Sequence, residues 1–408
     1  MSYLLNFEPK SETIKIQLPA SKSIANRLLI MQALSDHQLK LKNLSDAEDT
    51  QLLEAALKSK DSNINVGLAG TAYRFLTAYY AIQNERKTIL DGAKRMHERP
   101  IKLLVEVLQE MGADIQYLKT EGFPPLQING KQLKGGKITI DGSISSQYIS
   151  ALLMIAPYLE NDLSIQLSGR LVSLPYIDLT IGLMKSAGAQ VHREENILHV
   201  KKGNYFAEQS LQVEIDWSAA AFFYQFVALS DLSIELINLR FDSLQGDKKT
   251  ATHFEKLGVK SIETEKGILL SKTKIPNHAF ASFDLVDCPD LIPSIATVAS
   301  QLIDKTEIKG VTTLRIKESN RVEALQQELA KVNVKLIDVE EDTFEVYKGK
   351  KRSDTLPVFK THNDHRMAMC LTPLACILPS IKIENPEVVS KSFPSYWQEI
   401  KKLGISIS

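Results

Sequence analysis

The sequence predicts a mixed α/β protein made of two similar domains, each built from three copies of a compact unit. The chain has 408 residues, which is too long for one ordinary hydrophobic core and suits two domains. A motif also recurs along it: the last turns of an amphipathic helix, then Gly or Asn, then a short strand. The residues that end these helices are Gly112, Gly188, Gly258, Asn333 and Gly404, separated by 76, 70, 75 and 71 residues.

The spacing of this motif predicts the number of units. A period of about seventy residues is longer than that of common solenoid repeats and fits a unit of two helices and several strands. A sixth, weaker copy is expected to end near Asp61, in the segment EAALKSKDSNINV. Six units then give three per domain. Coincidence is the alternative, since such junctions are common in α/β proteins, but the regular spacing favours true repeats.

Composition limits the classes of partner. The chain carries 49 Lys and Arg against 49 Asp and Glu, so we expect no bulk electrostatic binding to nucleic acid or to an acidic membrane. A local basic site is still compatible with this balance. The cysteines, Cys288, Cys370 and Cys376, form no Cys-x-x-Cys pair, and we expect free thiols rather than a disulfide framework or a zinc site.

The ends and apolar runs of the chain predict its location. No stretch of 18 apolar residues occurs, so no transmembrane helix is expected. The first residues lack the basic-then-apolar layout of a signal peptide and lead directly into an alternating strand over residues 13–18. Together with the cysteine usage, this predicts a cytoplasmic protein.

The first candidate site follows that strand, in PASKSIANR (residues 19–27). A strand that ends here and a helix that begins near Ser21 would place backbone N–H groups and a helix N-terminus at one point, which favours an anion. Lys22 and Arg27 would add charge, and Ser23 a hydroxyl. A capped helix with solvated basic residues is the alternative.

Two further junctions lie in the first half of the chain. In residues 67–74 the small residues around Gly70 would let the backbone approach a ligand, although the Gly-Lys pair of a Walker loop is missing. Residues 92–100 place three cations, including Arg95, in six residues before a helix that starts with proline. A packing turn and a solvated basic turn are the respective alternatives.

Hydroxyls and an amide begin another predicted helix. Ser145, Ser146 and Gln147 can cap this helix or hold a phosphate, and the sequence leaves both roles open.

Three motifs in the last hundred residues complete the set. Around Glu318, three cations, Arg315, Lys317 and Arg321, suit either a proton shuttle or a surface network of ion pairs. In residues 362–370, His362 and His365 lack a third ligand at a suitable spacing, so no metal site is predicted. Lys391 precedes a group of aromatic residues that are expected to be core.

Considered together, the motifs share a place and a chemistry. Nearly all fall at strand-to-helix junctions, which open α/β architectures gather on one side of a sheet. We therefore expect one polyanionic site, with enough cations for two phosphorylated or carboxylated substrates. The cations expected to converge are Lys22, Arg27, Arg95, Lys317, Arg321, Arg366 and Lys391.

The motifs occur in the order found in the 5-enolpyruvylshikimate-3-phosphate synthase family, which the chain resembles from about residue 15 to residue 397. The segments are PASKSIANR, GLAGTAYR, KRMHERP, SSQY, LVSLPYID, RIKESNR, NDHRMAMC and KSFPSYW. The resemblance implies two similar domains, each of three βαβαββ units, arranged as an inside-out α/β barrel. It implies transfer of the enolpyruvyl group of phosphoenolpyruvate to the 5-hydroxyl of shikimate 3-phosphate, with release of phosphate and without a metal or organic cofactor.

The resemblance also implies roles for individual residues. Asp290 would be a candidate base, Glu318 would move the C3 proton, and Lys22 would act with them in catalysis. Shikimate 3-phosphate would be held by Ser23, Arg27, Ser145, Ser146, Ser173, Tyr176, Asp290 and Lys317. Phosphoenolpyruvate would be held by Lys22, Gly70, Arg95, Gln147, Arg321, His365, Arg366 and Lys391.

The expected domains are residues 21–216, and residues 1–20 with 217–408, with the active site in the cleft between them. Binding of two anions would draw the two cation sets together and close the domains. We expect a monomer whose partners are these two small molecules, with neither nucleic acid nor membrane.

Four positions depart from the family pattern: Leu68 replaces Asn, Phe75 replaces Pro, Thr313 replaces Asn and Asn320 replaces Asp. They bear on ligand affinity more than on the reaction, since the charged positions are kept. The rival interpretations are a UDP-N-acetylglucosamine enolpyruvyl transferase, an RNA 3′-phosphate cyclase and a non-catalytic anion-binding paralogue. The absence of cysteine before Cys288 argues against the first, the missing nucleophile motif against the second, and retention of Asp290 and Glu318 against the third.

Overall fold

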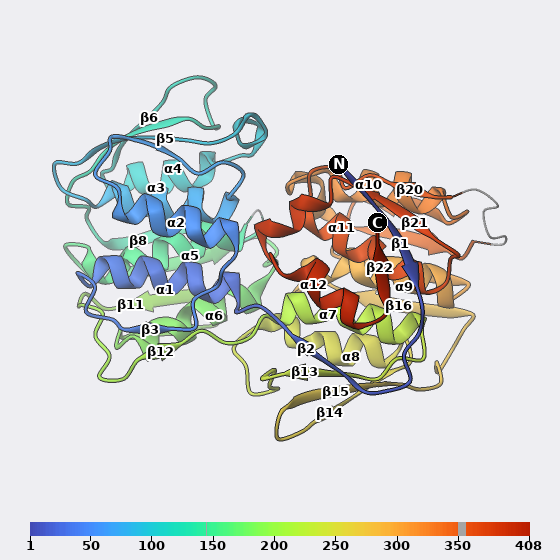
Figure 1. Cartoon of the computed structure of the whole chain (residues 1–408). Coiled ribbons are helices and arrows are strands. Elements are labelled where there is room, and N and C mark those ends of the chain that lie inside the picture. Colours follow the sequence, from blue (N-terminus) through green and yellow to red (C-terminus); the bar gives the residue numbers. More distant parts are fainter. Residues whose placement is uncertain (144, 350–355) are drawn as a thin grey trace. The chain divides into compact units, whose positions relative to one another are not determined.

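The computed structural model describes residues 1–143, 145–349 and 356–408. The chain divides into two compact units, one of residues 20–213 and the other of residues 1–19 with 214–408 (Figure 1). The first 19 residues therefore belong to the same unit as the C-terminal half. Within the described ranges, no helix is both long enough and apolar enough to cross a membrane.

In the unit of residues 20–213, the described residues form two four-stranded sheets with one topology and a third, two-stranded sheet. In each larger sheet the first two strands are parallel and the others antiparallel, in the orders β4-β5-β7-β6 and β8-β9-β11-β10. The small sheet pairs β3 in parallel with β12. The strands are β3 (Leu41–Lys42), β4 (Asn63–Asn65), β5 (Lys87–Asp91), β6 (Asp114–Tyr117), β7 (Leu126–Asn129), β8 (Gly136–Asp141), β9 (Leu163–Ser168), β10 (Val191–Glu194), β11 (Ile197–Val200) and β12 (Leu211–Gln212).

The helices of this unit form its interior. The residues of α3 are buried almost all round, as are those of α5, and an all-round apolar helix belongs in a core. Strands such as β9 instead alternate buried and partly or fully exposed residues, so their sheets keep one face toward solvent. The helices are α1 (Lys22–Leu34), α2 (Glu48–Lys58), α3 (Gly70–Ala81), α4 (Lys102–Glu110), α5 (Ser146–Ile155) and α6 (Leu174–Ser186).

The other unit repeats this plan in three four-stranded sheets of described residues, ordered β2-β13-β15-β14, β16-β17-β19-β18 and β20-β21-β1-β22. Both chain ends complete the last sheet, because β1 lies between β21 and β22 and is antiparallel to both. Its strands are β1 (Ser2–Phe7), β2 (Ile14–Gln17), β13 (Ile234–Ile237), β14 (Val259–Glu263), β15 (Gly267–Lys272), β16 (Phe280–Asp284), β17 (Lys305–Lys309), β18 (Lys335–Glu340), β19 (Thr343–Tyr347), β20 (Val358–Phe359), β21 (Ile381–Glu384) and β22 (Ile405–Ile407).

Buried helices again fill the centre of this unit. All residues of α11 are buried, and so are nearly all residues of α7. The thiols of Cys288 and Cys370 are buried and free, and Cys376 is free and partly buried. The helices are α7 (Trp217–Leu229), α8 (Thr250–Glu255), α9 (Ile292–Leu302), α10 (Arg321–Ala330), α11 (His365–Leu371) and α12 (Tyr396–Lys402).

The predicted mixed α/β fold of repeated units is confirmed. Each residue predicted to end a helix has a left-handed backbone and precedes an edge strand of its sheet. The φ values are +101° at Gly112, +85° at Gly188, +79° at Gly258, +61° at Asn333 and +95° at Gly404.

The sixth copy, expected near Asp61, has the helix and the strand but differs from the other five in how its strand pairs. Helix α2 ends at Lys58, and the strand that follows it, β4, pairs in parallel with β5 as the first strand of the next sheet. The other five copies instead lead into an edge strand that pairs antiparallel with its neighbour. The pattern of a helix followed by a strand is therefore too general to tell whether the strand ends one sheet or begins the next.

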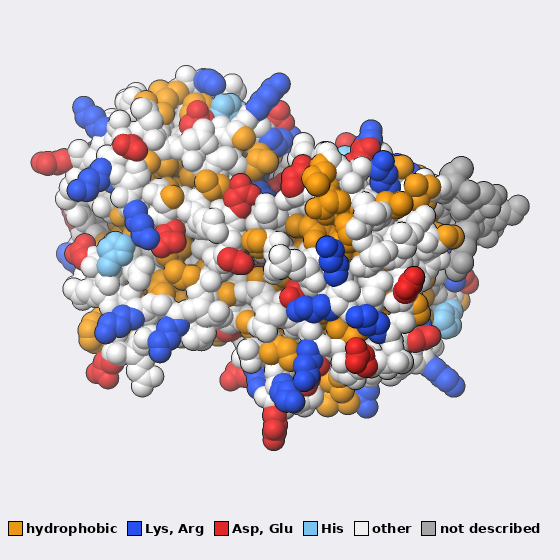
Figure 2. Space-filling model, viewed as in Figure 1, with side chains coloured by type: hydrophobic (Ala, Val, Ile, Leu, Met, Phe, Trp, Pro, Cys, Tyr) orange, Lys and Arg blue, Asp and Glu red, His pale blue; other side chains and the backbone are white. Residues whose placement is uncertain are grey.

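Charged side chains of both signs lie on the surface, in keeping with the equal numbers of basic and acidic residues. Basic and acidic groups are interspersed over the face that Figure 2 shows. The charge relevant to binding therefore has to be sought in local clusters.

Candidate functional site

The unit of residues 1–19 and 214–408 contains a cluster centred on Arg321, whose side chain is only 2 % exposed. Its Nη1 lies 3.0 Å from Asp290 Oδ1, and its Nη2 lies 2.8 Å from Glu318 Oε2. Its Nε and Nη2 also contact the two oxygens of Asp364, at 2.8 and 3.2 Å. One guanidinium thus orders three carboxylates. We name Arg321, Asp290, Glu318 and Asp364 together the Arg321 cluster.

Helix N-termini position the members of the Arg321 cluster. Asp290 lies in the 3-10 helix Pro289–Leu291 directly before α9, and Arg321 is the first residue of α10. Asp364 is the N-cap of α11, and its Oδ1 accepts the backbone N–H of Arg366 at 3.0 Å. The structure thus brings together three motifs that the sequence separates by up to 76 residues.

Asp290 is shared by several cations. Arg366 Nη2 lies 2.9 Å from its Oδ2, and Lys317 Nζ lies 3.6 Å from its Oδ1, in addition to the Arg321 contact. Burial would raise the pKa of Asp290, but Arg366, Lys317 and Arg321 together hold it well below the ordinary range. Asp290 is therefore ionised at neutral pH, and it is a weak proton acceptor while these cations surround it.

Glu318 has a second cation besides Arg321. Lys391 Nζ, at the end of the 3-10 helix Pro386–Lys391, lies 3.5 Å from its Oε1. Burial lowers the pKa of Lys317, whereas Asp364, Glu318 and Asp290 outweigh burial and raise that of Arg321. His365 is buried, with Nδ1 3.7 Å from Asp364 Oδ1. Four cations thus surround the three carboxylates of the Arg321 cluster, and this arrangement suits anionic ligands. The cations are Lys317, Arg321, Arg366 and Lys391.

In the unit of residues 20–213, Lys22 is the first residue of α1, and its Nζ lies 2.8 Å from Asp49 Oδ2. Asp49 is buried in α2, so the ammonium is held at the N-terminus of α1. Ser21, the N-cap residue, is buried as well.

Arg27 lies one turn deeper in α1 and is held by neutral groups. Its Nε donates to Thr180 Oγ1 at 2.7 Å, and its Nη2 donates to Ser150 Oγ at 3.1 Å. Its Nη1 donates to the Ser23 carbonyl at 2.9 Å, and the guanidinium lies 5.3 Å from the centroid of the Phe75 ring. Burial lowers the pKa of Arg27 to about 10. Phe75, one of the departures from the family pattern, therefore covers a face of this cation.

The hydroxyl residues lie at two other helix N-termini of this unit. Ser145 is the N-cap of α5 and accepts the N–H of Gln147 at 3.3 Å, and Ser146 is the first residue of α5. Gln147 Nε2 donates to Thr71 Oγ1 at 3.1 Å, which ties α5 to the start of α3 next to Gly70. Ser173 is the left-handed N-cap of α6, and Tyr176 lies in the first turn of that helix.

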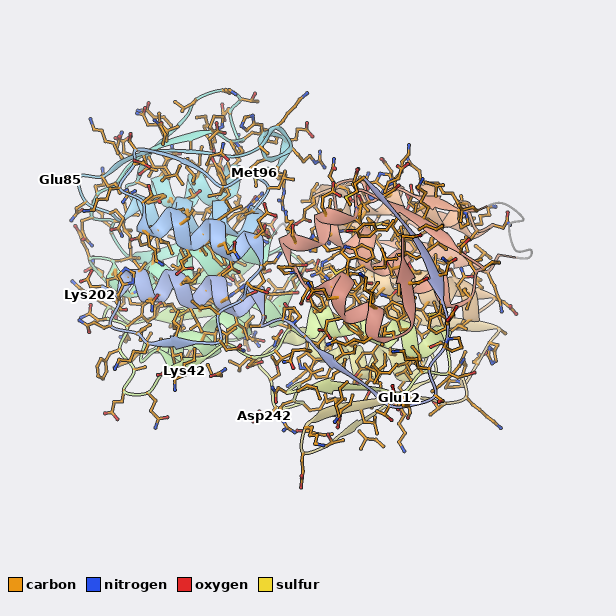
Figure 3. All side chains as sticks on the ribbon, in the orientation of Figure 1. Glu12, Lys42, Glu85, Met96, Lys202 and Asp242 are labelled. Atoms are coloured by element: carbon orange, nitrogen blue, oxygen red, sulfur yellow. The ribbon has the colours of Figure 1, made fainter. Side chains whose placement is uncertain are left out.

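Arg95 and Arg99 occupy different environments. Arg95 lies in the 3-10 helix Lys94–Glu98, forms an ion pair with Glu98 and has a side chain 36 % exposed. Arg99 is 6 % exposed, and a Cβ built on Gly70 would lie 2.6 Å from its Cζ. The buried Met96, labelled in Figure 3, lies in the same turn. The sequence predicted a role for Arg95 and none for Arg99, because charge alone does not distinguish two arginines of the same motif, KRMHERP.

Two further carboxyl groups were missed. Asp364 stood in a recognised motif without a role, and the structure makes it a partner of Arg321. Asp247 is buried and bonded to Ser218, and burial, followed by the nearby Asp290, raises the pKa of Asp247 to about 6. In the sequence, Asp247 lies in the segment LQGDKK, and no charge pattern or spacing there indicated a role for it.

Two departures from the family pattern have local explanations. Asn320 is the N-cap of α10 and accepts the N–H of Glu323 at 3.4 Å, which an aspartate would also do. Phe75 packs over Arg27, as described above. Among the described residues, no three or more His, Cys, Asp or Glu side chains are arranged to hold a metal ion.

Comparisons with known proteins agree in one family. The model of the EPSP synthase (3-phosphoshikimate 1-carboxyvinyltransferase) family matches residues 53–400. A 3-phosphoshikimate 1-carboxyvinyltransferase of Bacteroides fragilis (strain YCH46) is 45 % identical over 411 residues, covering 100 % of this chain and 99 % of the relative. One of Haemophilus influenzae (strain Rd) is 36 % identical over 418 residues, covering 95 % and 96 %. A solved EPSP synthase structure from Acinetobacter baumannii has a TM-score of 0.76 at 21 % identity, over 100 % of both chains.

Proposed function

This chain belongs to the EPSP synthase (3-phosphoshikimate 1-carboxyvinyltransferase) family, and on that basis we propose that it transfers the enolpyruvyl group of phosphoenolpyruvate to the 5-hydroxyl of shikimate 3-phosphate. The family predicted from the sequence is thereby confirmed. The reaction would serve the shikimate pathway toward chorismate and the aromatic amino acids. The Arg321 cluster carries the proposal, because it joins a buried cation to two candidate proton-transfer groups, Asp290 and Glu318.

The proposed reaction is an addition followed by an elimination. The 5-hydroxyl oxygen bonds to C2 of phosphoenolpyruvate while the hydroxyl loses its proton to a base and C3 gains a proton from an acid. The resulting tetrahedral intermediate then loses C3's proton, and the bond from C2 to the phosphate oxygen breaks. The products are the enolpyruvyl ether and inorganic phosphate. Fixed positive charge and well-placed proton carriers are what such a sequence requires.

We propose that the cations of both units act on the same pair of substrates. For phosphoenolpyruvate, these are Lys22, Arg321, Arg366 and Lys391, with Gly70, Gln147 and His365 beside them. Arg99 joins this group because it lies buried against Gly70, whereas Arg95 is partly exposed and paired with Glu98. For shikimate 3-phosphate, the residues are Ser23, Arg27, Ser145, Ser146, Ser173, Tyr176, Asp290 and Lys317.

Asp290 and Glu318 would move the protons. Substrate anions that bind Arg366 and Lys317 would weaken the field of these cations on Asp290. Its pKa would rise toward the ordinary range, and it would become a stronger base only when substrate is bound. Glu318, held between Arg321 and Lys391, would exchange the C3 proton.

We further propose a cytoplasmic monomer that needs neither a metal nor an organic cofactor. The free thiols suit a reducing compartment, and the chemistry above uses only side chains of the protein. Turnover should be unchanged after exhaustive dialysis against a chelator, and light scattering should give the mass of one chain.

Phosphorus NMR of a mixture of the two substrates tests the reaction. We expect one inorganic phosphate for each phosphoenolpyruvate consumed, together with a retained phosphate ester on the six-membered ring of the product. A non-catalytic paralogue would bind both compounds and form no phosphate. Phosphate formed while shikimate 3-phosphate is not consumed would identify a phosphatase and refute the proposal.

A further inference from the structure

Helix α10 is joined to the segment Val358–Arg366 at two places. Arg321 begins α10, and Glu328 lies seven residues later on the same face, because seven residues are close to two helical turns. At the first place, Arg321 binds Asp364 of the segment. At the second, Glu328 binds residues nearer the start of the segment. At the first place the carboxylate is Asp364, which belongs to the segment. At the second it is Glu328, which belongs to α10.

Glu328 is bonded on both oxygens and is only 1 % exposed. Its Oε1 lies 2.8 Å from His362 Nε2, and its Oε2 accepts the backbone N–H of Lys360 at 2.8 Å. Lys331 Nζ lies 2.5 Å from Oε2 and donates to the Val358 carbonyl at 2.8 Å. Although burial opposes its charge, its bonds to His362, Lys331 and Lys360 hold the pKa of Glu328 below the ordinary value.

The backbone between these two places, at His362 and Asn363, has an unfavourable conformation that neighbouring groups must stabilise. His362 and Asn363 have φ values of +52° and +54°, in the left-handed region. Residues other than glycine adopt this region at an energetic cost, even though His and Asn are among those found there most often. The Asp364 N–H donates to the Thr361 carbonyl at 2.8 Å and closes the turn. His362, the first of the strained pair, is the residue that Glu328 binds.

The turn determines where the next residues point. Directly after it, Asp364 accepts the N–H of Arg366 and so starts α11. The Arg366 side chain then reaches Asp290, at 2.9 Å from Oδ2 and 3.2 Å from the backbone carbonyl. A turn released at His362 would displace the partner of Arg321 and the origin of Arg366 together.

We propose that Glu328, acting through His362, is a positioning residue that sets Arg321 and Arg366 for phosphoenolpyruvate. This inference rests on the proposed function for the identity of the ligand. Neither Glu328 nor His362 belongs to the Arg321 cluster, and both act on it only through the turn.

Steady-state kinetics of Glu328→Ala, Glu328→Gln and His362→Ala test the proposal. We expect Glu328→Ala and His362→Ala to raise KM for phosphoenolpyruvate by about tenfold or more, with KM for shikimate 3-phosphate changed less than about twofold. Glu328→Gln keeps an oxygen for the Lys360 N–H and has an amide group that can hydrogen-bond His362 Nε2, so it should rescue most of the loss. Folded Ala variants with an unchanged KM for phosphoenolpyruvate would overturn the proposal.

Glu399 offers a matched control in the same unit. It is 7 % exposed, contacts Lys402 at 2.7 Å with the same three-residue spacing, and accepts the backbone N–H of Gln17 in β2 at 3.0 Å. Glu399→Ala therefore removes an equivalent buried carboxylate that holds a different strand. It should destabilise the protein comparably and leave the ratio of the two KM values unchanged. The same shift in that ratio in Glu399→Ala would overturn a specific role for Glu328.

Hydrogen exchange separates this inference from the proposed function. In Glu328→Ala, the amides of residues 360–366 should exchange at least about tenfold faster than in the wild-type chain, whereas Glu399→Ala should affect residues 14–17. Unchanged exchange at residues 360–366 would overturn the role of Glu328 in holding the turn. A wild-type chain that forms no phosphate would instead overturn the proposed function, and the exchange data would still decide the role of Glu328.

Discussion

Gly70 and Arg99 lie so close together that a Cβ at position 70 would be 2.6 Å from Cζ of the guanidinium. Gly70 is the first residue of α3, and Arg99 follows the 3-10 turn of residues 94–98. A side chain at position 70 can be accommodated only if Arg99 moves. The helix N-terminus and the buried cation are therefore one structural feature, although 29 residues separate them in the sequence.

Gly70→Ala should weaken phosphoenolpyruvate binding without unfolding the protein. The displaced guanidinium would leave the N-terminus of α3, while alanine itself favours the helix. We expect KM for phosphoenolpyruvate to rise about tenfold, with KM for shikimate 3-phosphate changed less than about threefold. Steady-state kinetics with each substrate varied in turn measures both. Equal rises in the two KM values would contradict a local effect through Arg99.

Substitution of the two arginines of KRMHERP distinguishes their roles. Arg99→Lys shortens the reach of a buried cation and removes its planar donors, so kcat/KM for phosphoenolpyruvate should fall by about 100-fold. Arg95→Lys is the matched control, because Arg95 is partly exposed and paired with Glu98. It should change kcat/KM by less than about twofold. The reverse order of effects would restore the original expectation that Arg95 binds the substrate.

Asp290→Asn should separate anion binding from catalysis. The substitution removes the carboxylate shared by Arg321, Arg366 and Lys317, and so raises the local positive potential. Inorganic phosphate should then bind at least as tightly as to the wild-type chain, while kcat falls by about 100- to 10,000-fold. Calorimetry and kinetics measure the two effects. Weaker phosphate binding would show that Asp290 organises the cations more than it neutralises them.

Asp247 should give the folded protein a specific pH dependence. Its pKa is raised from 3.8 to about 6, so its contribution to stability is fully present below pH 3.8 and is lost as pH rises through about 6. Relative to wild type, Asp247→Asn should gain up to about 3 kcal/mol of unfolding free energy between pH 4 and pH 7. Urea denaturation at several pH values measures this difference. A difference that does not change with pH would contradict the raised pKa.

The repeated units were predictable from the sequence because one local rule recurs. A helix that ends in a left-handed residue before an edge strand leaves a Gly or Asn at regular spacing, as at Gly188 and Asn333. Near Asp61 the pattern is incomplete, because the extended Ser59 follows α2 and the chain leads into the first strand of a new sheet. Strand order is a tertiary property, and no local pattern encodes it.

The site was predictable only to the level of its motifs. Which arginine of KRMHERP faces inward depends on the 3-10 turn, which neither charge nor spacing reveals. The partners of Arg27, Ser150 and Thr180, lie 123 and 153 residues from it in the sequence. The roles of Asp247 and Glu328 likewise depend on burial and on distant partners. These contacts arise from tertiary packing, which sequence patterns do not specify.

The rate of phosphate release from phosphoenolpyruvate tests the proposed reaction most directly. The measurement compares shikimate 3-phosphate, UDP-N-acetylglucosamine and no acceptor, with a chelator present throughout. We predict release with shikimate 3-phosphate alone. Release with UDP-N-acetylglucosamine, or none with either acceptor from a folded sample, would refute the proposed transfer to shikimate 3-phosphate.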